Sequence, residues 1–180
     1  MPDHVVAIFF LRDGTNLCTS LRCYEEVLAE IKSEYSSRLL YKYSAVARRE
    51  FSTFYAEQIQ NAYLSDETEI WQQQQAALQH IQALCQENGS SFDLVIFPIL
   101  FDLNENYPFH EVESEILRFA NMANIPAFSL TSGFLGQSAE DLWVSPNDQH
   151  PNELGHKIAA ETLLPFLIEI LGNRNRLHND

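Results

Sequence analysis

An acid and a histidine near the C-terminus have the residue types and the spacing needed for acid–base chemistry. Asp148 stands two residues before His150, and Pro151 follows the histidine directly. Proline disfavours a helical backbone at the residue before it, and Asn152 is a good N-cap for a helix that carries Leu154. His150 is therefore expected on a loop just before the last helix, where Asp148 can orient its ring as a general base for a hydroxyl.

Three short apolar runs predict the strands that must position this pair. They lack polar alternation, as strands buried on both faces of a parallel sheet do, and they comprise residues 5–11, 94–100 and 126–130. Sequence of helical period follows the first run at 21–35 and the second at 109–123. This alternation predicts an α/β fold with right-handed crossovers. Because open α/β sheets bind ligands at the carboxyl ends of their strands, His150 is expected at that edge.

The connection between the first two strands is longer than a crossover needs. A βαβ unit closes with about a dozen residues, whereas residues 12–93 separate the first two runs. We interpret residues 38–88 as a helical insertion in a single domain spanning 1–180. Its aromatic residues favour packing between helices over a ligand site. They are Tyr41, Tyr43, Phe51, Phe54, Tyr55, Tyr63 and Trp71.

Composition and charge exclude several classes of protein. The chain has 11 Lys and Arg against 25 Asp and Glu, and its formal net charge of −14 would repel a nucleic-acid backbone. Three cysteines do not indicate a disulfide framework. The histidines lack Cys or carboxylate partners at metal spacing, so a zinc site is not predicted. No other metal and no organic cofactor is expected. The N-terminal apolar run has no basic region before it and no cleavage site. It therefore predicts a strand rather than a signal peptide or membrane span, with a cytoplasmic location as the default expectation.

The segment around His150 resembles a block of a known family. The run DQHPNELGHKIAAETL, residues 148–163, is similar to the last conserved block of the SGNH (GDSL-type) esterase and acyl-hydrolase family. The opening PDHVVAIFFLRDG, residues 2–14, resembles the third block of that family. The resemblance covers most of the chain outside the insertion. It implies a three-layer flavodoxin-like fold, a parallel sheet flanked by helices, in which Asp148 and His150 belong to a Ser-His-Asp triad.

The serine block of that family does not occur in the chain. Neither Gly-Asp-Ser nor Gly-x-Ser-x-Gly is found in the 180 residues. The resemblance therefore implies the C-terminal portion of a hydrolase, without its N-terminal strands, or a remnant that lost its nucleophile. The family's oxyanion asparagine would fall at Arg12, with Asn16 as a nearby substitute. Its acid, three residues before the histidine, would fall at Asn147, whereas Asp148 stands two before.

Other polar residues follow the predicted strands. Asp13 follows the first strand, and Asp102 and Asn104 follow the second, so all three are candidates for substrate contact. Turn formation is the preferred interpretation of Asp102 and Asn104, because Asp and Asn stabilise turns locally. Cys18, after the first strand, is an alternative nucleophile that would make a Cys-His hydrolase.

The strand at 5–11 is expected to be an unprotected edge. In a flavodoxin-like sheet of order 2-1-3-4-5, loss of the first two strands exposes the third. A run that is apolar on both faces and contains no Lys or Pro is not protected against pairing with another strand. We predict that it pairs with upstream residues or with another copy of the chain.

The leading hypothesis is an SGNH-like hydrolase or O-acyl transferase acting on a small-molecule or glycan acyl ester. His150 would be the base and Asp148 its orienting acid, with the serine supplied from outside this chain. The alternatives are a non-catalytic remnant or partner-binding domain that uses the insertion and the open edge, and a weaker nucleotide- or phosphate-binding domain. The last lacks a Gly-rich loop after any strand.

Overall fold

A three-stranded parallel sheet forms the centre of the protein, whose computed structural model describes residues 2–11, 45–65, 69–146 and 148–177. Strand β1 (His4–Phe10) pairs with β2 (Ser91–Phe97), and β2 pairs with β3 (Ala127–Ser129). The central strand β2 is buried almost throughout, which explains its continuous apolar run. The α/β class expected from the sequence is confirmed.

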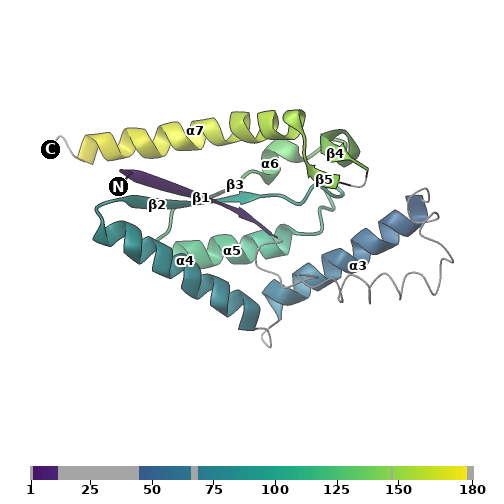
Figure 1. Cartoon of the computed structure of the whole chain (residues 1–180), viewed down its shortest axis with the longest axis horizontal. Helices are drawn as coiled ribbons and strands as arrows, with labels where there is room; N and C mark the ends of the chain where they lie inside the picture. Colours follow the sequence, from purple (N-terminus) through teal and green to yellow (C-terminus); the bar gives the residue numbers. More distant parts are fainter. Residues whose placement is uncertain (1, 12–44, 66–68, 147, 178–180) are drawn as a thin grey trace.

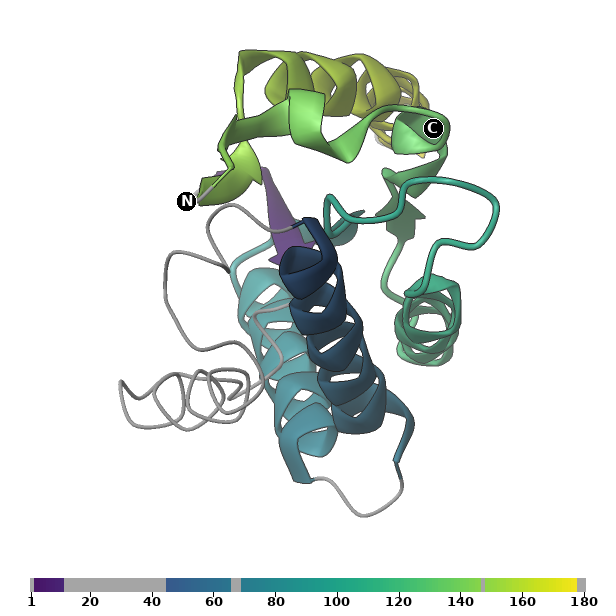
Figure 2. The ribbon, with the colours of Figure 1, turned by 90° about the vertical axis from the view of Figure 1, so that its right-hand side faces the viewer.

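Helices cover both faces of this sheet (Figure 1). On one face lie α3 (Ala45–Leu64), α4 (Glu69–Glu87) and α5 (His110–Met122), and on the other lies α7 (Glu153–Leu177). Figure 2 shows the same division after a quarter turn. Phe166 of α7 stacks on Phe128 of β3 with ring centroids 4.8 Å apart. Between β3 and α7 come α6 (Thr131–Phe134), the 3₁₀ helix η1 (Ala139–Leu142), β4 (Trp143–Ser145) and β5 (Asp148–Pro151).

Aromatic residues of the predicted insertion join its helices to the sheet. Tyr63 of α3 contacts Phe9 of β1 and Trp71 of α4, with ring centroids 6.5 and 5.2 Å away. Its hydroxyl donates to the Leu11 carbonyl oxygen at 2.9 Å. Trp71 in turn packs edge-on against Phe119 of α5 at 5.3 Å. The packing interpretation is therefore confirmed for Tyr63 and Trp71, which are buried in the core next to β1, and it stays a prediction for the aromatics whose side chains the structure does not describe.

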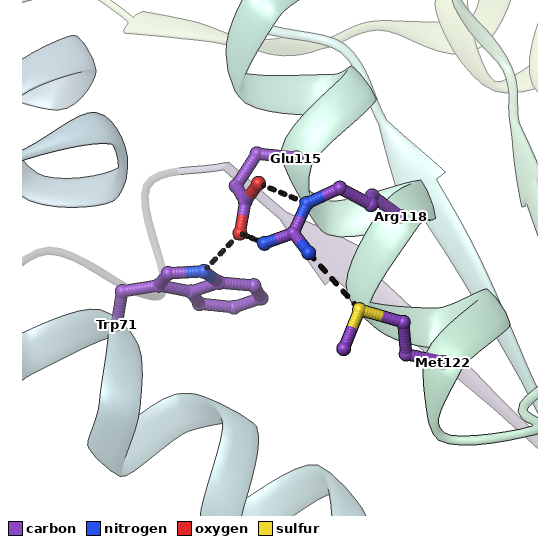
Figure 3. Close-up of polar contacts among 4 residues, drawn as sticks. All are labelled: Trp71, Glu115, Arg118 and Met122. Atoms are coloured by element: carbon purple, nitrogen blue, oxygen red, sulfur yellow. Dashed lines mark hydrogen bonds and ion pairs between the residues drawn. The ribbon is translucent and has the colours of Figure 1, made fainter.

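A polar cluster on the surface connects α4 with α5 (Figure 3). Glu115 accepts a hydrogen bond from Trp71 Nε1 at 3.2 Å and a bidentate pair from Arg118 at 2.7 and 2.8 Å. The Arg118 guanidinium also donates to Met122 Sδ at 3.0 Å. Hydrogen bonding from Arg118 lowers the pKa of Glu115. Glu115 and Arg118 both lie on α5 and the Arg118 side chain is 58% exposed, so their ion pair adds little stability. The hydrogen bond from Trp71 is the contact in this cluster that joins α4 to α5.

The two ends of β2 differ from those predicted from the sequence, because backbone hydrogen bonding determines where the strand begins and ends. Strand β2 begins and ends three residues earlier than predicted, at Ser91 and Phe97 rather than at 94 and 100. It ends before Pro98 because proline has no backbone N–H to donate to the ladder. It begins early because Ser91 lies opposite His4 of β1. The predicted crossover helix at 21–35 lies outside the described residues.

Strand β1 is an edge of the described sheet, as the sequence predicts. It pairs with β2 alone among the strands that the structure describes, and its residue Ile8 is 52% exposed. What pairs with this edge stays a prediction. Of the described helices, none combines the length and apolar character needed to cross a membrane.

Gly133 is required where α6 touches α7. A Cβ at this position would lie 2.0 Å from Thr162 Oγ1 and 3.0 Å from Thr162 Cβ. Gly133→Ala is therefore expected to lower the free energy of unfolding by about 1–3 kcal/mol, measured by urea denaturation. Gly172→Ala is the matched control, because a Cβ there meets nothing within 4 Å. Equal stability of the two variants would contradict this packing.

Candidate active site

His150 lies on a short β-hairpin, so the loop expected from the sequence is wrong. Strand β4 pairs antiparallel with β5, placing Trp143 opposite Pro151 and Ser145 opposite Asp148. Proline favours an extended backbone at the residue before it, and this serves a strand as well as a loop. The sequence pattern excluded a helix at His150 but did not distinguish the two extended alternatives.

Hydrogen bonds hold this hairpin beside the carboxyl end of β2. Trp143 Nε1 donates to the carbonyl oxygen of Leu100, three residues after β2, at 2.9 Å. Asn152 Nδ2 donates to the carbonyl oxygens of Asp141 and Trp143 at 2.8 and 3.1 Å. Figure 1 shows β4 and β5 at the end where the arrows of the sheet finish. This is the edge at which open α/β sheets bind ligands.

The start of α7 packs directly against the hairpin. Asn152 Oδ1 accepts hydrogen bonds from the backbone N–H groups of Leu154 at 2.9 Å and Gly155 at 3.1 Å, so the predicted N-cap is confirmed. A Cβ on Gly155 would lie 3.0 Å from Pro151 Cβ. Glycine therefore allows the helix to approach the strand that carries His150.

Asp148 and His150 contact each other at the surface of this edge. Asp148 Oδ1 lies 2.5 Å from His150 Nδ1 and accepts a second hydrogen bond from the His150 backbone N–H at 3.2 Å. The imidazole hydrogen bond, followed by the backbone one, lowers the pKa of Asp148. The His150 side chain is 78% exposed. With Nδ1 turned to the carboxylate, Nε2 is the ring atom left to act as a base.

The two candidates after β2 take part in a turn. Asp102 has a left-handed backbone with φ of 45°, and its carbonyl oxygen accepts from the Asn104 N–H at 2.7 Å. Asn104 Oδ1 accepts from the Asn106 N–H at 2.8 Å. These local contacts match the turn interpretation of both residues.

Several predicted residues lie outside the described residues, and their roles stay predictions. They are the oxyanion candidates Arg12 and Asn16, the contact candidate Asp13, the alternative nucleophile Cys18, the residue Asn147, and the aromatics Tyr41 and Tyr43.

A buried carboxyl near the same edge was missed in the sequence. Glu113 of α5 is 5% exposed and accepts hydrogen bonds from Thr131 Oγ1 and, at 3.2 Å, from Ser129 Oγ. Burial raises the pKa of Glu113. Burial and the nearby Glu113 carboxylate raise that of Tyr107, whose hydroxyl accepts from the Ile99 N–H at 3.0 Å. The one sequence signal for this network was an acid beside the apolar face of a predicted helix.

Glu113→Gln is expected to flatten the pH dependence of stability. Because the folded-state pKa of Glu113 is raised, its contribution is fully present below the ordinary value of 4.5 and is lost as the pH rises through the folded value. The uncharged amide avoids that loss, so the variant should lose less unfolding free energy above pH 4.5 in a urea series.

The control is Glu115→Gln on the same helix. Since the pKa of Glu115 is lowered, its contribution is present above the ordinary value and is lost as the pH falls, so this substitution should change the acid side of the curve. A wild-type curve as flat as that of Glu113→Gln would contradict the burial argument.

No protein-family profile matches the chain, and comparisons with curated proteins and with solved structures also found no match. Within the described ranges, no group of three or more His, Cys, Asp or Glu side chains is placed to hold a metal ion. The geometry of the Asp148–His150 pair is therefore the main evidence on which a function can be argued.

Proposed function

We propose that the protein is an SGNH-like hydrolase of acyl ester bonds, or an O-acyl transferase of that type, in which His150 is the general base. The carrying observation is the 2.5 Å contact between Asp148 Oδ1 and His150 Nδ1 on an exposed ring beside the carboxyl end of β2. A three-layer flavodoxin-like fold belongs to the same proposal. The parallel sheet between α7 and the other long helices supports it.

In the proposed reaction a serine hydroxyl attacks the carbonyl carbon of the ester while His150 Nε2 takes its proton. Asp148 orients the ring and stabilises the imidazolium that forms. The tetrahedral intermediate then releases the alcohol, which receives the proton from His150, and water hydrolyses the acyl-serine by the same route. The lowered pKa of Asp148 supports this role, because the carboxylate must be negative when the ring becomes positive.

The serine belongs to a Gly-Asp-Ser segment that the 180 residues do not contain. In a flavodoxin-like sheet, the strand that carries this segment pairs with the strand corresponding to β1. The outer edge of β1, open among the described strands, suits such pairing. The proposed substrate is a small-molecule or glycan acyl ester.

A non-catalytic partner-binding domain is the second candidate. The observation that favours it is the same open edge, where Ile8 is 52% exposed. On this view the Asp148–His150 pair would have no hydroxyl to deprotonate.

Ester hydrolysis separates the two candidates. We expect almost no turnover of p-nitrophenyl acetate by the chain alone, and clear turnover once a polypeptide carrying a strand that ends in Gly-Asp-Ser is joined to it or supplied with it. Absence of turnover in a folded complemented form would favour the partner-binding domain. Brisk turnover by the chain alone that is lost in Cys18→Ala would instead assign the thiol as nucleophile.

A further inference from the structure

A serine meets another histidine and another aspartate at the opposite end of the sheet. His4 begins β1, and Ser91 and Asp93 lie near the start of β2, opposite His4 and Val6 in the parallel register. His4 Nδ1 lies 2.5 Å from Ser91 Oγ, and His4 Nε2 lies 2.9 Å from Asp93 Oδ2. Since the strands run for seven residues, this cluster is roughly 20 Å from the carboxyl edge.

The imidazole of His4 lies between the hydroxyl of Ser91 and the carboxylate of Asp93. One ring nitrogen faces a hydroxyl and the other faces a carboxylate, which is the arrangement of a nucleophile, its base and the group that orients the base. The Asp93 side chain is 0% exposed and that of His4 is 17% exposed. His4 Nε2 and Asp93 Oδ2 are within the distance of an ion pair but do not have the angles of a hydrogen bond. We therefore expect the carboxylate to act on the ring through its charge. Burial strengthens this effect because water screens it less.

The spacing of residues along the chain does not reveal that His4 contacts the carboxylate of Asp93. His4 and Ser91 are 87 residues apart, and only the register of β1 on β2 brings them together. No local pattern of spacing could have shown the contact.

Ser91 is partly exposed to solvent. It is half-buried, and its neighbours Asp3 and Gly89 are exposed. Its Oγ also lies 3.3 Å from the Asp3 carbonyl oxygen, but the contact with His4 is shorter by far. His4 is therefore the better acceptor of the single hydroxyl proton.

The backbone around Ser91 argues for slow turnover. The Ser91 N–H donates to the Asp3 carbonyl oxygen at 3.2 Å, and the Ser90 N–H donates to that of Cys85 at 2.8 Å. Both donors are engaged and cannot stabilise an oxyanion, an interaction worth about 10²–10³ in rate for a single donor. With His4 as base but without free N–H donors for the oxyanion, Ser91 should form an acyl-serine that is hydrolysed only slowly.

We propose that Ser91 is a reactive serine that accepts one acyl or phosphonyl group from an activated donor, with His4 as its general base and Asp93 as the charge that stabilises the protonated ring. With a fluorophosphonate, the Ser91 Oγ–P bond forms and the P–F bond breaks. The hydroxyl proton passes to His4 Nδ1, and fluoride leaves. With an activated carboxylic ester, the bond between Ser91 Oγ and the acyl carbon forms and the bond between that carbon and the alkoxy oxygen breaks. The leaving alkoxide then takes the proton from His4. This site does not depend on the role proposed for His150.

The test is labelling of the folded chain with a fluorophosphonate probe, followed by intact mass and peptide mapping. We expect one adduct, located on Ser91 and lost when the chain is unfolded in urea. Ser91→Ala should remove it, whereas His4→Gln should slow labelling about 10²-fold or more. Ser90→Ala is the matched control, because the Ser90 hydroxyl bonds the Pro2 carbonyl oxygen and not His4, so labelling should persist.

His150→Ala should also label normally, which keeps this proposal distinguishable from the proposed hydrolase. Peptide mapping of the labelled wild-type chain, folded and unfolded, tests the reactivity of Ser91 even if His4→Gln does not fold. A folded wild-type chain with no adduct at Ser91 would overturn the proposal. So would labelling of Ser91 at the same rate in the unfolded chain or in a folded His4→Gln variant.

Discussion

His150→Ala is expected to lower kcat for ester hydrolysis by about 10³-fold or more when the chain is complemented with a strand that ends in Gly-Asp-Ser. The imidazole takes the serine proton in one step and returns it to the alcohol in the next, so its removal affects both. KM should change little, because the ring of His150 handles protons rather than the body of the substrate. The measurement is steady-state hydrolysis of a p-nitrophenyl ester.

His156→Ala is the matched control for this substitution. His156 is also exposed and also lies in the C-terminal segment, but it follows the N-cap of α7, and its backbone N–H donates to the Asn152 carbonyl oxygen. Its removal should leave kcat unchanged. Near-wild-type hydrolysis by His150→Ala would refute the base assignment, whatever His156→Ala does.

Asp148→Asn is expected to give the second largest loss, about 10²–10⁴ in kcat. The amide keeps the size of the side chain but removes the charge that stabilises the imidazolium, and its NH₂ group can turn the ring into the wrong tautomer. Because Asp148 acts through His150, its substitution should also shift the pH profile of kcat/KM, which a merely structural change would not do.

Asp102→Asn is the control for the loss of one negative charge near the same edge. Asn accepts the left-handed backbone found at Asp102, so the turn should persist and activity should be kept. A large loss of activity in Asp102→Asn would instead assign that residue to substrate contact. Unchanged activity and pH profile in Asp148→Asn would contradict the orienting role of Asp148.

The elements that sequence could predict are those decided by local pattern. The helix around Trp71 and Cys85 follows from its apolar spacing and ends before Gly89, whose φ of 69° is the left-handed conformation that terminates helices. The N-cap at Asn152 follows from residue type alone. Asp148 and His150 could be paired because two residues of extended backbone hold them within reach.

Contacts made by tertiary packing could not be predicted in this way. His4 meets Ser91 and Asp93 because β1 pairs with β2 in one register, and a shift of one residue would turn His4 to the other face. The Glu113 carboxyl accepts hydrogen bonds from the hydroxyls of Ser129 and Thr131, which lie 16 and 18 residues further along the chain. Neither contact can be predicted from the spacing of residues along the chain.

The tautomer of His150 tests the central claim most directly, and it is read from ¹H–¹⁵N spectra of the ring nitrogens in the folded chain at a pH where the imidazole is neutral. We predict a proton on Nδ1, hydrogen-bonded to Asp148, and a bare Nε2 ready to accept one, with this preference lost in Asp148→Asn. A proton on Nε2 in the wild-type chain, or a spectrum that Asp148→Asn leaves unchanged, would contradict the assignment of His150 as an oriented base.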